Sequence, residues 1–156
     1  MRTRRGGAAA KAGHDLDMLV TAWEGTLEIG EESSAELSAD ATSLRVQKGT
    51  GGMQPLGEED IANIHQTIDD EVLRRRDIVF RSTRVRADGS RLEVEGELTL
   101  AGTTQPIVFE LEGGDDGRLA GSAVVAQTRW GMKPYSALWG ALKVLDEVEV
   151  ALDARV

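Results

Sequence analysis

The sequence predicts a mainly β protein, an antiparallel extended β-barrel with one helix near residues 58–73 and a short helical or irregular segment near 131–145. Two observations lead to this fold class. Residues 92–100 read Leu-Glu-Val-Glu-Gly-Glu-Leu-Thr-Leu, and this alternation is typical of a strand with one dry face. Several other short segments share the pattern and end in turn residues, which favours a closed or nearly closed sheet around an apolar interior.

The N-terminal part is predicted to contain two strands. Residues 1–13 are rich in Gly, Ala and Arg and are compatible with either a flexible arm or a clipped first strand. Residues 14–156 are expected to form a single domain, because a chain of 156 residues can bury a core without disulfides. A strand is predicted over 18–29, and a second, more polar strand over 35–46.

One helix is predicted after the second strand. Residues 58–60 are acidic and suit a first turn, where the helix dipole favours negative charge. Four apolar residues follow at spacings of three and four, namely Ile61, Ile64, Ile68 and Val72. The helix therefore packs one side against something apolar, and we expect it to lie across one opening of the barrel.

The C-terminal half is predicted to be a series of hairpins. Its strands are expected at about 78–87, 91–101, 105–112, 118–130 and 146–155. Asp-Gly and Gly-Thr-Thr sequences separate several of them and are suitable for tight turns. Consecutive hairpins imply up-and-down order. The intervening segment 131–145 is too apolar for a plain surface loop, and we expect it to gate a mouth of the barrel.

Composition excludes several classes of function. The net charge of −9, from 27 acidic and 18 basic residues, disfavours nucleic acid and anionic membranes as partners. The absence of cysteine excludes thiolate metal sites and thiol nucleophiles. No stretch reaches the roughly 20 apolar residues of a membrane span, so no stable membrane insertion is expected. As written, the sequence predicts a cytoplasmic protein, whereas a chain that begins after a removed leader would be periplasmic or secreted.

Four segments of the sequence, taken in order, resemble the motifs of a known protein family. They are Phe80-Arg81-Ser82-Thr83, Gly96 to Ile107 (Gly-Glu-Leu-Thr-Leu-Ala-Gly-Thr-Thr-Gln-Pro-Ile), Arg129-Trp130-Gly131-Met132 and Asp146-Glu147-Val148-Glu149-Val150. Together they resemble the YceI-like family of polyisoprenoid-binding proteins. The resemblance implies a lipocalin-like barrel with an apolar tunnel that holds a polyprenyl chain or an isoprenoid quinone, a role in lipid transport, and a possible homodimer. The sequence departs from the family's common pattern in the helix region 58–76, which puts the identity of the ligand in doubt.

The candidate ligand-binding residues combine aromatic, Met and Leu side chains with one His. They are His14, Trp23, Phe80, Phe109, Trp130, Met132, Tyr135, Leu138, Trp139 and Leu142. Tryptophans suit the wall of a tunnel because they offer large flat surfaces, although plain core filling is the alternative for each. His14 and Tyr135 are placed where a polar head group could accept or donate a hydrogen bond.

Two other functions remain open at this point. An enzyme of the same fold could use His14 and Asp15 as an acid–base pair, but no nucleophile motif or metal-ligand cluster accompanies them. A barrel filled by its own side chains would instead be an interaction module. We therefore expect a binding protein, not an enzyme, with an apolar small molecule as its partner and neither a metal nor a cofactor.

Overall fold

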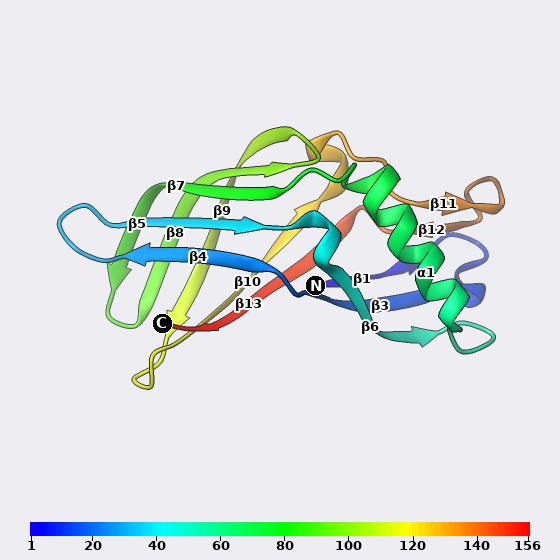
Figure 1. Ribbon diagram of the computed structural model, residues 1–156, viewed down its shortest axis with the longest axis horizontal. Helices are drawn as coiled ribbons and strands as arrows, with labels where there is room; N and C mark the ends of the chain where they lie inside the picture. Colours follow the sequence, from blue (N-terminus) through cyan, green and yellow to red (C-terminus); the bar gives the residue numbers. More distant parts are fainter.

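The computed structural model describes all 156 residues and confirms the predicted fold class. A ten-stranded antiparallel sheet is strongly curled into a half-barrel, and α1 (Glu58–Thr67) lies over one end of it (Figure 1). The sheet has the order β4-β5-β7-β8-β9-β10-β13-β1-β3-β6. Its strands are β1 (Arg2–Thr3), β3 (His14–Val20), β4 (Trp23–Glu28), β5 (Ser34–Ala39), β6 (Leu44–Gly51), β7 (Ile78–Asp88), β8 (Arg91–Leu100), β9 (Thr103–Gly113), β10 (Arg118–Ala126) and β13 (Glu147–Arg155).

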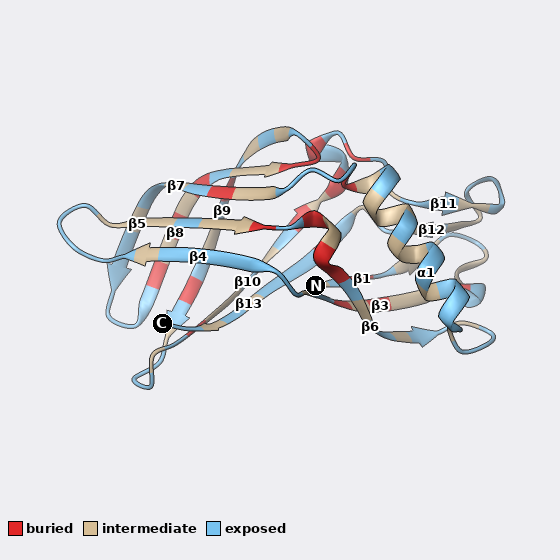
Figure 2. Cartoon of the chain, in the orientation of Figure 1, coloured by how far each residue is buried: buried red, intermediate tan, exposed pale blue.

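The predicted hairpin series β7 to β10 is present in the expected order. The register pairs Val94 with Phe109 and Leu92 with Leu111, so apolar residues of adjacent strands share one face. Val94 is fully buried at the centre of this face. Buried residues form bands across these strands while the positions between them are exposed or intermediate, as alternation requires (Figure 2).

The two predicted N-terminal strands are each broken in the middle. Residues 18–29 divide between β3 and β4, and residues 35–46 divide between β5 and β6. The break between β5 and β6 is a 3-10 turn, Ala41–Ser43, in which the Thr42 N–H donates to Asp40 Oδ1 (2.8 Å). The backbone N–H of Ala22 donates to Ser43 Oγ (3.1 Å), so the two breaks lie side by side. Side-chain hydrogen bonds thus accompany the backbone hydrogen bond from the Thr21 N–H to the carbonyl of Ser43 (3.2 Å), an arrangement that strand periodicity does not reveal.

The helix begins at Glu58, as predicted, and extends to residue 72. Its α-helical part continues into one π-helical turn, Ile68–Val72. Asp60 Oδ2 accepts from the Gly57 N–H (2.9 Å) and satisfies one free donor of the first turn. Neither the length nor the hydropathy of any helix suffices for a membrane crossing.

Residues 131–145 form a small hairpin that joins a second, three-stranded sheet. This sheet contains β11 (Ser136–Ala137), β12 (Leu142–Val144) and β2 (Arg5–Gly6). A 3-10 turn, Leu138–Gly140, forms the tip of the hairpin. The N-terminal residues thus contribute β1 to the large sheet and β2 to the small one, and both sheets meet near the end covered by α1 (Figure 1).

Candidate functional site

The concave face of the large sheet and the inner face of α1 bound a cavity of about 580 Å³. Of the 36 residues that line it, 29 are hydrophobic. The predicted apolar side of the helix supplies Ile64, Ile68 and Val72, so the helix forms a roof over part of the cavity. A volume of this size lies within the usual range of ligand pockets, roughly 300–1,000 Å³.

Phe80 and Phe109 form the aromatic part of the wall. Their ring centroids are 5.2 Å apart at an interplanar angle of 60°, a tilted arrangement that aromatic pairs favour. Phe80 on β7 is paired with Leu98 on β8, which also lines the cavity. These side chains converge because inward positions on adjacent strands stand side by side.

Three more of the predicted residues line the cavity. Met132 is buried, and its backbone N–H donates to the carbonyl of Gln127 (3.1 Å). Trp23 at the start of β4 and Tyr135 before β11 are 43% and 46% exposed, so each belongs to the rim of the cavity. Together with Phe80 and Phe109, the structure brings five of the ten predicted residues to one cavity.

Trp130 lies in the hydrophobic core and outside the cavity lining. Only 1% of it is exposed, and its indole Nε1–H donates to the carbonyl of Leu98 (2.7 Å). Trp130 lies in a 3-10 turn, Gln127–Trp130, because β10 ends at Ala126 and not at residue 130 as the alternation suggested. The turn thus holds Trp130 in the core, where its indole anchors the backbone of Leu98, a residue of the cavity wall.

The other predicted residues of segment 131–145 also lie outside the cavity lining. Leu138 is 60% exposed and Trp139 is fully exposed at the tip of the β11–β12 hairpin. Leu142 is half-buried, and its side chain lies against the backbone of Gly13. The hairpin therefore reaches the cavity only through its base, where Tyr135 and Val144 are located.

His14 and Asp15 do not form a pair. Consecutive strand residues point to opposite faces, and each side chain has a different backbone partner. The His14 Nε2 atom is hydrogen-bonded to the carbonyl of Gln54 (2.9 Å), whereas Asp15 Oδ1 accepts from the Arg5 N–H (2.8 Å). Neither residue lines the cavity. The geometry that an acid–base pair needs is not formed here.

Two buried polar residues of the cavity wall were not anticipated from the sequence. Thr3 lies on β1 and Gln127 follows β10. The Gln127 Nε2 donates to the carbonyl of Leu145 (3.1 Å), but the Thr3 hydroxyl is buried without any hydrogen-bond partner. An unpartnered buried hydroxyl costs about 1–3 kcal/mol. Because the N-terminal segment was open between an arm and a strand, nothing in the sequence indicated that Thr3 faces inward.

Asp146 fixes the turn that carries Gln127 and Trp130. Its two carboxylate oxygens accept from the Thr128 N–H (2.8 Å) and the Thr128 hydroxyl (2.6 Å). These hydrogen bonds stabilise the charged carboxylate and lower the pKa of Asp146 below its usual value. Asp146 thus ties the end of β10 to the start of β13.

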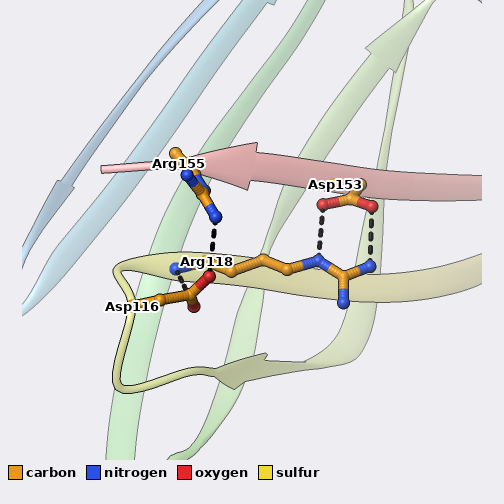
Figure 3. A network of polar contacts seen from close by, with 4 residues as sticks. All are labelled: Asp116, Arg118, Asp153 and Arg155. Carbon is orange, nitrogen blue, oxygen red and sulfur yellow. Dashed lines mark hydrogen bonds and ion pairs between the residues drawn. The ribbon is translucent and has the colours of Figure 1, made fainter.

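The end of the β10–β13 pair is held by ion pairs (Figure 3). The guanidinium of Arg118 binds both oxygens of Asp153 (2.9 and 2.7 Å), and Arg155 binds Asp116 (2.8 Å). The hydrogen bond from Arg118 is the main reason why the pKa of Asp153 is lowered. Asp153 is the one residue with a charged side chain in the cavity lining, and its carboxylate is already occupied by Arg118.

The chemistry of the site is that of an apolar container. No group of three or more His, Asp or Glu side chains is arranged to hold a metal ion.

Residues 8–156, nearly the whole chain, match the YceI-like domain. The chain belongs to the YceI-like family. The family is one of binding proteins with a polyisoprenoid-binding fold, as the resemblance in the sequence implied.

Solved structures support the same fold. Burkholderia cenocepacia BcnA is 15% identical with a TM-score of 0.66, and the alignment covers 87% of this chain and 84% of that one. A Campylobacter jejuni YceI protein is 13% identical with a TM-score of 0.61, over 90% of this chain and 84% of that one. No curated protein sequence matches the chain. At these identities the YceI-like structures share the fold, and their ligands do not transfer.

Proposed function

We propose that this YceI-like protein binds a long apolar isoprenoid, a polyprenyl chain or an isoprenoid quinone, inside the cavity. It would act as a carrier, buffer or sensor and leave the ligand chemically unchanged. The observation that carries the proposal is the 580 Å³ cavity, in which hydrophobic residues make up 29 of the 36 that line it. The polyisoprenoid-binding fold of the family supports the same class of ligand.

The energetics favour a chain over a small apolar molecule. Burying one methylene is worth about 0.8 kcal/mol, so one isoprene unit offers roughly 3–4 kcal/mol. Association and ordering cost about 4–15 kcal/mol, so at least two units are needed for useful affinity. A cavity whose wall draws on most strands of the sheet and on α1 provides such a length of contact.

The base of the 131–145 segment is proposed as the gate. Met132 and Tyr135 line the cavity, while the hairpin tip at Leu138 and Trp139 extends into solvent. Opening this segment would break the short β11–β12 and β12–β2 ladders and leave the large sheet intact. The segment can therefore move at the cost of two short ladders, without opening the large sheet.

The proposal is tested by extraction and by a variant that fills the cavity. Protein purified from its host is extracted with organic solvent, and the extract is examined by mass spectrometry for isoprenoids. Separately, binding of an added polyprenol is measured for Ala123→Phe. Ala123 lies on β10 and lines the cavity. The matched control is Val124→Phe, the next residue on the outer face of the same strand, where the side chain is 60% exposed.

We expect a bound isoprenoid in the extract. We also expect Ala123→Phe to lose at least tenfold in polyprenol affinity, which corresponds to about 1.4 kcal/mol of binding free energy, and Val124→Phe to keep the affinity of the wild type. Equal affinity in both variants would contradict binding in this cavity. Repeated absence of lipid, together with no uptake of added polyprenol or quinone, would instead favour an interaction module.

A further inference from the structure

We propose that the ligand is an uncharged isoprenoid, and that the Thr3 hydroxyl binds an alcohol or carbonyl oxygen at its head. This inference rests on the proposed function and specifies its ligand class. It comes from a mismatch inside the wall, because the cavity contains a buried polar group that the protein does not satisfy.

Thr3 is held firmly in an inward position. It is paired with Leu16 on β3, and the preceding residue Arg2 is paired with Asp17 and Glu149, so β1 is inserted between two strands of the sheet. Only 7% of Thr3 is exposed, and its Oγ1 atom has no hydrogen-bond partner. Nearly all buried polar groups in proteins are hydrogen-bonded, so the unpartnered hydroxyl of a cavity-lining residue is the polar group that a ligand oxygen would satisfy on entering.

Further polar groups gather on the same part of the wall. The Leu145 N–H donates to the carbonyl of Arg4 (2.8 Å), and the carbonyl of Leu145 accepts from Gln127 Nε2 (3.1 Å). Gln127 is therefore one hydrogen-bonded residue away from Arg4, the residue that follows Thr3. The Val144 N–H donates to the carbonyl of Tyr135 (2.9 Å), which adds a phenol at the neighbouring rim.

These additional groups are suited to a neutral head. The Gln127 Oε1 atom and the Tyr135 hydroxyl make no hydrogen bond within the protein, in contrast to the Gln127 Nε2. An amide oxygen accepts from a hydroxyl, and both threonine and tyrosine hydroxyls donate to a carbonyl or hydroxyl oxygen. The wall therefore offers one or two donors and an acceptor, the complement of an alcohol or a quinone.

The same wall is unsuited to a phosphorylated head. No lysine, arginine or histidine side chain lines the cavity. The amino group of Met1 lies nearby but donates to the carbonyl of Met18 (2.8 Å), and desolvation is the main reason why its pKa is lowered. A buried diphosphate needs paired cations or several charged hydrogen bonds, and the cavity supplies none.

The test compares three ligands that share one chain. Binding of geranylgeraniol, its diphosphate and the matching hydrocarbon without a head is measured by tryptophan fluorescence. The wild type is compared with Thr3→Val, which keeps the shape and removes the hydroxyl. Thr3→Ser restores a hydroxyl, and Thr26→Val is the matched control on the exposed face of β4. Thermal unfolding without ligand shows that each variant is folded.

We expect the alcohol to bind at least tenfold more tightly than the diphosphate. Thr3→Val should lose about three- to tenfold in affinity for the alcohol and nothing for the hydrocarbon, as expected for one neutral hydrogen bond. Thr3→Ser should recover most of the loss, and Thr26→Val should behave as the wild type. Without ligand, Thr3→Val should unfold at the same or a higher temperature, because its orphan hydroxyl is gone.

Two results would overturn the inference while leaving isoprenoid binding intact. One is a diphosphate that binds as tightly as the alcohol, and the other is a Thr3→Val variant whose preference for alcohol over hydrocarbon is unchanged. If none of the three ligands binds to the wild type, the proposed function itself fails.

Discussion

Two Trp-Gly pairs lie nine positions apart in the chain and have opposite environments. Trp130-Gly131 and Trp139-Gly140 each end a 3-10 turn, and each glycine has a positive φ, 69° and 86°. Trp130 is 1% exposed in the core, whereas Trp139 is fully exposed at a hairpin tip. The local sequences are alike, so the difference comes from what holds each turn.

The first turn is held by residues distant in sequence. Asp146 binds Thr128, and the indole of Trp130 binds the carbonyl of Leu98. The second turn is held by a two-residue ladder, Ser136–Ala137 with Leu142–Lys143, and has left-handed φ angles at Leu138 and Trp139. A left-handed non-glycine residue costs about 1–2 kcal/mol. The comparison shows that tertiary hydrogen bonds, and not local apolar composition, decide which tryptophan is buried.

The largest expected effect is that of Trp130→Ala. Removing a fully buried indole should lower the free energy of unfolding by about 3–5 kcal/mol, because a cavity remains and the carbonyl of Leu98 loses its donor. Chemical denaturation measures this loss. A loss below about 1 kcal/mol would mean that the turn is not anchored by Trp130.

A smaller effect is expected for Asp146→Ala, about 1 kcal/mol at neutral pH, the usual cost of replacing by alanine a side chain that accepts a hydrogen bond from a backbone N–H. The pKa of Asp146 is lowered in the folded state, so the carboxylate contributes stability above its unfolded pKa of about 3.9. That contribution is lost as the pH falls through the lower, folded pKa. Denaturation from pH 7 down to about pH 2 should show a steeper decline in the wild type than in the variant. Parallel pH profiles would contradict the role of Asp146.

The two glycines allow the anchoring to be compared directly. A Cβ at Gly131 or Gly140 would meet no atom closer than 3.8 Å, so alanine at either position costs only the left-handed conformation, about 1 kcal/mol. We expect the full cost in Gly131→Ala. We expect less in Gly140→Ala, because the hairpin tip can relax without unfolding the large sheet. Equal losses in denaturation would show that the tip is as firmly held as the anchored turn.

The smallest effect is expected for Trp139→Ala. An exposed side chain without tertiary contacts changes the free energy of unfolding by no more than about 0.5 kcal/mol. The same denaturation experiment measures it beside Trp130→Ala. A loss above about 2 kcal/mol would require that Trp139 is covered in solution, and sedimentation would then show whether a second copy covers it.

The strands of the C-terminal half could be predicted because each of them alternates without interruption. β7, β8, β9 and β13 lie within a few residues of the expected ranges, and the helical spacing of Ile64, Ile68 and Val72 indicated the roof of the cavity. The breaks at residues 21–22 and 40–43 could not be predicted, because they depend on a local hydrogen bond to Asp40 and on a hydrogen bond between Ala22 and Ser43, which are 21 residues apart.

The site was predictable where a residue lies on a regular strand. Phe80 and Phe109 face the cavity because the alternation of β7 and β9 fixes their direction. The segment 127–145 has no regular period, so strand alternation gives no direction for Leu138 or Trp139, and the burial of Gln127 depends on hydrogen bonds that its turn makes with Leu145 and Asp146, some 18 residues later in the chain. Thr3 faces inward only because β1 is inserted between β3 and β13.

The sheet order ends at β4 on one side and at β6 on the other, and no ladder joins these two strands to close a ring. In a fully closed barrel, strand number and shear fix the circumference. Here β4 is hydrogen-bonded only to β5, although Trp23 of β4 and Leu152 of β13 line the same cavity. The girth of this container can therefore adjust to guests of different thickness along the free edge of β4 without breaking a strand ladder, while backbone hydrogen bonds of Thr21 and Ala22 to Ser43 and Asp40 hold the two edges together at their junction.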